Sequence, residues 1–166
     1  GFGLMPATFM YSPVVYDMDG DGIQEVIIGV ADTETGESRI SVRNYDGTEK
    51  WGYTFNGFIN AGYETGLFHW VTGDFTGDGV QDIFAFLYRG GFNSEVGYLI
   101  DGDAKNAVFY GDDIATRGFG PYAGYATVAD TNLNGTDDLI MIAKDYLVIL
   151  EWDKTLQTMA KLVQIN

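Results

Sequence analysis

The chain has 166 residues, of which 46% are hydrophobic and 15% aromatic, enough apolar material for one folded domain. Its formal net charge of −15 argues against binding nucleic acid or an anionic membrane through bulk charge. Cysteine is absent, which excludes disulfides and thiol chemistry, and no apolar run reaches the roughly 18 residues of a membrane span.

The predicted secondary structure is all β, because long helix-period segments are absent and short apolar runs alternate with turn residues. These runs fall into three groups of four strands. In chain order the first group covers residues 10–16, 25–30, 39–45 and 50–55; the second covers 69–73, 82–88, 95–100 and 107–110; the third covers 125–129, 138–143, 146–152 and 157–165.

The three groups predict three tandem antiparallel units, with repeats at approximately 1–55, 56–110 and 111–166. The second strand of each unit is almost continuously apolar, so we expect it to be buried on both faces between neighbouring sheets. Adjacent antiparallel strands then put the connections from strand 1 to 2 and from strand 3 to 4 at one end of the sheets. The remaining connections lie at the opposite end.

An acidic nine-residue loop joins the first two strands of each unit, at residues 17–25, 74–82 and 130–138. Side-chain oxygens occupy positions 1, 3, 5 and 9, and glycine occupies position 6. Calcium takes six to eight oxygen ligands, including carboxylates and backbone carbonyls, so this spacing predicts up to three Ca²⁺ sites. With position 7 contributing its carbonyl, the predicted ligands are Asp17, Asp19, Asp21, Ile23, Glu25, Asp74, Thr76, Asp78, Val80, Asp82, Asp130, Asn132, Asn134, Thr136 and Asp138.

An EF-hand shares the first half of this pattern but needs a glutamate at position 12 and flanking helices. Position 12 is Ile28, Ala85 or Met141, and the flanking segments are strand-like. The alternative that such clusters are simple β-turns is disfavoured by three copies in register, recurring after 57 and 56 residues.

The three loops resemble those of FG-GAP/VCBS repeats, the calcium-binding blades of integrin-α-like β-propellers. The resemblance implies four-stranded blades, with the calcium loop between the first two strands. Two loops depart from the usual pattern, through Thr76 in the second and through Asn132 and Asn134 in the third. Since the first loop has the most carboxylates, we expect it to bind calcium most tightly.

Three blades do not close a ring, because propellers typically have about four to eight blades. We therefore expect further blades from a larger chain, or self-association. The longer connections at the end opposite the acidic loops are rich in glycine and aromatic residues, which suits a protein or carbohydrate ligand. The candidate contacts are Tyr63, Arg89, Phe92, Arg117, Phe119 and Tyr122.

The sequence thus predicts a segment of an extracellular β-propeller that serves binding or adhesion, with calcium in a structural role. One alternative is a subunit of a fibre or surface layer, and another is part of a secreted polysaccharide lyase. Catalysis has little support, since the single histidine, His69, lies beside a predicted strand and no Gly-x-Ser-x-Gly motif occurs.

Overall fold

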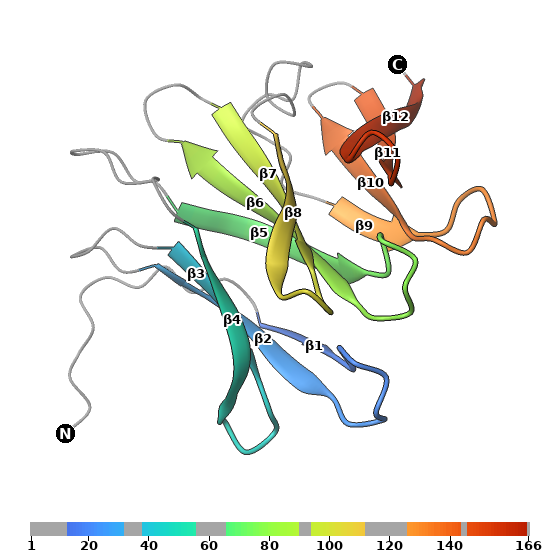
Figure 1. Ribbon diagram of the computed structural model, residues 1–166. Helices are drawn as coiled ribbons and strands as arrows, with labels where there is room; N and C mark the ends of the chain where they lie inside the picture. Colours follow the sequence, from blue (N-terminus) through green and yellow to red (C-terminus); the bar gives the residue numbers. More distant parts are fainter. Residues whose placement is uncertain are drawn as a thin grey trace.

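The computed structural model describes residues 13–31, 38–55, 66–89, 94–111, 126–143 and 146–165, and all regular structure in them is β (Figure 1). The first sheet has the order β1 (Val14–Tyr16), β2 (Glu25–Ala31), β3 (Ser38–Arg43), β4 (Glu49–Phe55). The second has the order β5 (Gly66–Gly73), β6 (Asp82–Arg89), β7 (Ser94–Asp101), β8 (Asn106–Gly111). The third has the order β9 (Ala126–Ala129), β10 (Asp138–Ala143), β11 (Tyr146–Asp153), β12 (Thr158–Ile165).

Within each sheet, strands adjacent in sequence pair antiparallel. The predicted all-β fold of three four-stranded antiparallel units is confirmed. Figure 1 shows the three sheets side by side, with the second between the other two. In the described part of the chain, no helix could cross a membrane.

The second sheet is covered on both faces. Along β6, Ile83, Ala85 and Leu87 belong to the apolar core shared with the first sheet. Phe84 and Phe86 alternate with them and belong to the core shared with the third sheet. All five side chains are completely buried, which is the two-sided burial that a continuously apolar strand predicts.

The prediction of two-sided burial is wrong for the corresponding strands of the outer sheets, β2 and β10. In β2, Ile27 is buried, but its neighbours Val26 and Ile28 are only half-buried. In β10, Met141 is buried whereas Ile142 is 54% exposed. The physical reason is that each outer sheet has one neighbouring sheet within the described chain, so the apolar residues of its other face have no covering layer.

A polar contact crosses the uncovered face of the first sheet. The Arg39 guanidinium donates to both carboxylate oxygens of Glu49 at 2.5 and 2.6 Å, and the Ser41 hydroxyl donates to the same carboxylate at 2.8 Å. A Cβ at Gly52 would lie 2.6 Å from the guanidinium, so glycine leaves the space that Arg39 occupies. The bonds from Arg39 and then Ser41 lower the pKa of Glu49 to about 2.

The burial pattern predicts unequal costs for two apolar truncations. Leu87→Ala removes a fully buried side chain between sheets and should lower the free energy of unfolding by about 2–5 kcal/mol. Ile142→Ala is the control, because its side chain is more than half exposed, and it should cost less than about 1 kcal/mol. Urea unfolding followed by circular dichroism measures both, and equal costs would contradict two-sided burial of β6.

The Glu49 contact predicts a pH-dependent stability. Because the folded-state pKa is lowered, the contribution is complete above the unfolded-state value of about 4.3 and is lost as the pH falls through about 2. Glu49→Gln should therefore destabilise by about 1 kcal/mol at pH 7 and by less at pH 3. A difference in unfolding free energy that stays constant between these pH values would contradict the assigned contact.

Candidate metal centre

The three acidic loops share one internal hydrogen-bond pattern that starts at position 1. The first aspartate of each loop accepts a hydrogen bond from the backbone N–H of the glycine at position 6, with N···O distances of 2.8–2.9 Å. The pairs are Gly22 to Asp17, Gly79 to Asp74 and Gly135 to Asp130. These glycines have φ values of 86°, 89° and 87°, the left-handed region that glycine adopts without strain. The carboxylate therefore holds each loop in a tight curl.

Positions 5 and 9 fix the rest of the curl in the same way. The side chain at position 5 accepts the N–H of position 7, at 2.7–2.9 Å in the three loops. The carboxylate at position 9 accepts an N–H from position 2 or 3. Its donors are Met18 for Glu25, Thr76 for Asp82 and Thr131 for Asp138, at 2.8–2.9 Å.

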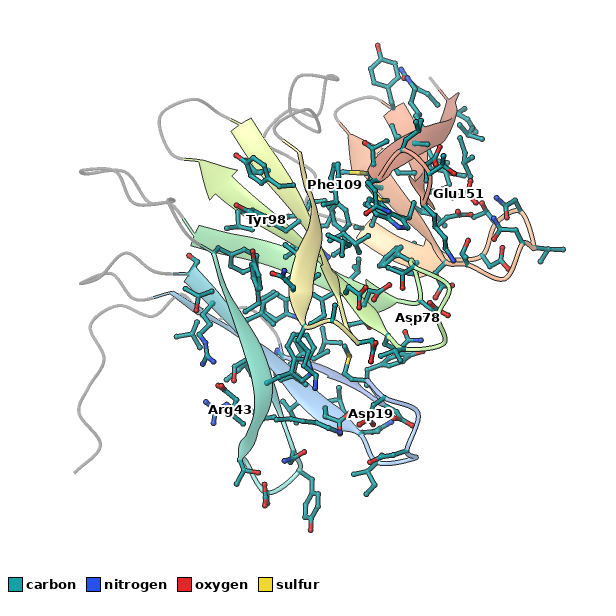
Figure 2. All side chains as sticks on the ribbon, viewed as in Figure 1. Asp19, Arg43, Asp78, Tyr98, Phe109 and Glu151 are labelled. Carbon is teal, nitrogen blue, oxygen red and sulfur yellow. The ribbon has the colours of Figure 1, made fainter. Side chains whose placement is uncertain are left out.

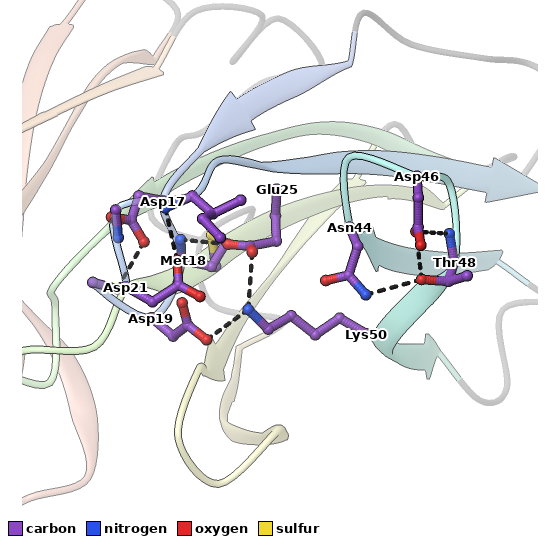
Figure 3. A network of polar contacts seen from close by, with 12 residues as sticks. Asp17, Met18, Asp19, Asp21, Glu25, Asn44, Asp46, Thr48 and Lys50 are labelled. Carbon is purple, nitrogen blue, oxygen red and sulfur yellow. Dashed lines mark hydrogen bonds and ion pairs between the residues drawn. The ribbon is translucent and has the colours of Figure 1, made fainter.

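In the first loop the structure brings together the carboxylates of Asp17, Asp19 and Asp21, whose nearest oxygens all lie within 4.8 Å of one another. Glu25 is buried at the base of the loop. The Lys50 ammonium lies 2.6 Å from Asp19 Oδ2 and 2.8 Å from Glu25 Oε1 (Figure 3). The hydrogen bond from Lys50 lowers the pKa of Asp19, and the bonds to Asp19 and Glu25 raise the pKa of Lys50.

Among the described residues, no basic side chain forms an ion pair with the position-9 carboxylate of the second loop. Asp82 is fully buried and also accepts the Gly102 N–H at 2.9 Å. Its burial raises the pKa of Asp82 to about 6, and the N–H bonds from Gly102 and Thr76 oppose that rise. The Thr76 hydroxyl at position 3 is buried with no hydrogen-bond partner.

The third loop differs most from the other two. Asp138 is fully buried, and its Oδ1 has no hydrogen-bond partner. The side-chain amides of Asn132 and Asn134 both donate to Glu151 of β11, the former at 3.4 Å. Leu133 occupies position 4 with a φ of 60°, where the other loops have glycine.

These groups fit an oxygen-preferring divalent cation. The aligned positions offer carboxylate, amide and hydroxyl oxygens, which are calcium ligands. A buried oxygen without a partner is costly, and Asp138 Oδ1 and Thr76 Oγ1 are such atoms at ligand positions. The backbone carbonyls of Ile23, Val80 and Thr136 remain predicted ligands.

Backbone hydrogen bonds join neighbouring loops and so join neighbouring sheets. The N–H of Gln81, at position 8 of the second loop, donates to the Met18 carbonyl of the first at 3.1 Å. The N–H of Asp137, at position 8 of the third, donates to the Asp74 carbonyl at 2.9 Å. Asp137 Oδ2 also accepts the Asp74 N–H at 2.8 Å. The loops therefore lie at one end of the sheets, as Figure 2 shows for Asp19 and Asp78.

The sequence pattern missed Lys50 and Glu151. Lys50 lies on β4 and Glu151 on β11, so neither belongs to a nine-residue loop. Strand pairing brings these two residues to the loops. The local sequence carries no signal for their contacts beyond the predicted strand order.

The candidate ligand contacts at the opposite end are mostly outside the described residues. That applies to Tyr63, Phe92, Arg117, Phe119 and Tyr122, while Arg89 ends β6 and its side chain is not described. His69 stacks on Phe86, with 6.0 Å between ring centroids. Burial lowers the pKa of His69, against an opposing backbone hydrogen bond at Ala126.

Comparison with known proteins agrees with this geometry. Residues 17–85, which include the first two loops, match the model of the FG-GAP-like repeat. This part of the chain carries FG-GAP-like repeat sequence. The predicted resemblance to this repeat family is thereby confirmed.

Two curated relatives are integrin alpha pat-2 proteins. The Caenorhabditis briggsae protein is 40% identical over 72 residues, which is 43% of this chain and 6% of the relative. The Caenorhabditis elegans protein is 38% identical over 81 residues, which is 48% of this chain and 6% of the relative. The chain thus aligns with a small part of each relative's length. No solved structure was found to match it.

The backbone at Leu133 predicts a stabilising substitution. Leu133 is 89% exposed and has a positive φ, so Leu133→Gly removes strain at little packing cost and should raise the unfolding free energy by about 0.5–1 kcal/mol. Leu156 is the control, because it is 70% exposed without a positive φ, and Leu156→Gly should be destabilising. Urea unfolding with calcium present tests both, and destabilisation by both would contradict the strained turn.

Proposed function

We propose that this chain is a segment of an extracellular β-propeller that binds calcium and serves adhesion or binding at the cell surface. The observation that carries the proposal is the hydrogen-bond pattern shared by the three acidic loops. In each loop it curls the backbone in the same way around side chains whose oxygens are of the kind that binds calcium. The similarity to integrin alpha chains supports the location and the adhesive role. On this proposal each sheet is one repeat, divided near residues 55 and 110.

The bound calcium has a structural role in this proposal. Carboxylates held together in one loop repel one another, and a divalent cation offsets that repulsion. The side chains that would hold it are those at positions 1, 3, 5 and 9 of each loop. Because position 8 of one loop hydrogen-bonds to the preceding loop, an ordered loop also fixes the joint between two sheets. Calcium would thus stabilise the packing of sheet on sheet.

The partner would bind at the end of the sheets opposite the acidic loops, where β2, β4, β6 and β8 end. Antiparallel strand order separates these strand ends from the acidic loops. A protein or a carbohydrate at the cell surface is the proposed ligand class, and the six candidate contacts named above belong to the connections predicted there or to their edges.

The uncovered faces of the outer sheets favour a further contact, either with more blades of a longer chain or with a second copy of this chain. Apolar side chains of the third sheet, among them Ile142 and Ile165, are more than half exposed. The chain aligns with 6% of its relatives' length, so further blades of a longer chain are the first candidate for covering these faces. A second copy stacked head to tail, as in a fibre, is the alternative that light scattering of the isolated chain would reveal.

The proposal predicts calcium-dependent stability. At a calcium concentration about 100 times the dissociation constant, each occupied site should add about 2.7 kcal/mol to the unfolding free energy. Calcium should therefore raise the thermal midpoint by several degrees relative to EDTA. Asp138→Asn should reduce that calcium-induced shift, because it alters a buried position-9 carboxylate.

Asp103→Asn is the matched control, since it makes the same charge change at an exposed turn residue outside the loops. It should leave the calcium-induced shift intact. A midpoint that is the same in calcium and EDTA, for the unaltered chain, would overturn the proposed calcium role.

A further inference from the structure

We propose that Lys50 is a built-in competitor of calcium at the first loop. This inference rests on the proposed calcium binding. It reverses the expectation from carboxylate number alone, because the loop with the most carboxylates would not be the tightest site. Lys50 would instead set the affinity of that loop and stand in for the ion when calcium is absent.

The Lys50 ammonium lies between two ligand carboxylates of the first loop. Lys50 extends from β4 to two ligand positions of the first loop, 2.6 Å from Asp19 at position 3 and 2.8 Å from Glu25 at position 9 (Figure 3). Glu25 is 1% exposed, whereas the side chains of Lys50 and Asp19 are 27% and 41% exposed, so only the Glu25 carboxylate is fully shielded from water. A charge interacts more strongly with a shielded carboxylate than with one on an open surface.

The equivalent carboxylates of the other loops have no such cation. In the second loop, Asp82 Oδ1 accepts the neutral Gly102 N–H, and in the third, Asp138 Oδ1 has no partner. Lys154 approaches Gly77 of the second loop without an ion pair to its carboxylates. Among the described residues, an ion pair between a lysine ammonium and the predicted ligand carboxylates thus occurs in the first loop alone.

The charges explain what this contact does. Positions 1, 3, 5 and 9 carry four carboxylates in the first loop and three in the second. One ammonium brings the first loop from −4 to −3, the charge of the second. A calcium ion entering the first loop must displace Lys50 from Asp19 and Glu25 or bind against its repulsion, and either reduces the affinity.

Calcium titration of the 15N-labelled chain, followed at backbone amides, tests this inference loop by loop. Gly22, Gly79 and Gly135 occupy position 6 of the three loops, so each amide reports calcium binding in its own loop. In the unaltered chain, Gly22 should not titrate at the lowest calcium concentration. In Lys50→Met, the Gly22 dissociation constant should fall by about tenfold, while those of Gly79 and Gly135 stay the same.

Lys161→Met is the matched control, because it removes the same charge from an exposed lysine that bonds to Gln164 on β12. It should leave the Gly22 constant unchanged. Lys50→Gln is a second variant, whose neutral amide can still donate to the buried Glu25, and it should also tighten the first loop. In EDTA, both Lys50 variants should unfold at a lower temperature than the unaltered chain, because Glu25 then lacks its cation.

The outcomes separate this inference from the proposed function. If the three glycine amides respond to calcium but Gly22 titrates identically in the unaltered chain and both Lys50 variants, the inference is overturned and calcium binding stands. If Lys161→Met tightens the first loop as much as Lys50→Met, a general charge effect replaces the specific contact. If no amide responds in any variant, the inference and the proposed function are both overturned.

Discussion

The structure depends on carboxylate oxygens that hold the backbone N–H groups of their own loops. In each loop the position-1 aspartate bonds to the glycine amide at position 6, and the position-9 carboxylate bonds to an amide near the loop's start. In the first loop the carboxylates of Asp17, Asp19 and Asp21 lie close together, which is unfavourable without a counter-charge. There the interaction that shapes the loop also favours a bound cation.

This requirement connects the loops to the packing of the sheets. Each loop sits between the first two strands of its sheet, and backbone bonds such as Asp137 to Asp74 tie it to the loop before. Two apolar cores lie on opposite faces of β6. Tyr98 belongs to one core, and Phe109 packs against the other (Figure 2). Loop order and sheet packing are thus coupled, so a structural ion would stabilise more than the loop that holds it.

Much of the fold could be predicted from the sequence, because apolar runs and turn residues recur with a period that local patterns reveal. β6 and β10 begin at their predicted first residues, Asp82 and Asp138, and the loops lie between the strands as their spacing predicted. What local sequence could not predict was set by neighbours across strands and sheets. Lys50 and Glu151 reach the loops through strand pairing, and Ile142 is exposed because no described sheet covers it.

Equilibrium dialysis of the unaltered chain against calcium, with bound metal counted by atomic absorption, measures whether the three loops bind ions. The count of bound ions does not depend on any model of stability. If each loop holds one ion, binding should saturate at three calcium ions per chain, with no loss when magnesium is present in moderate excess. Saturation at zero would contradict the proposed calcium binding, and the carboxylate-held loops would then be turns that hold their shape without an ion.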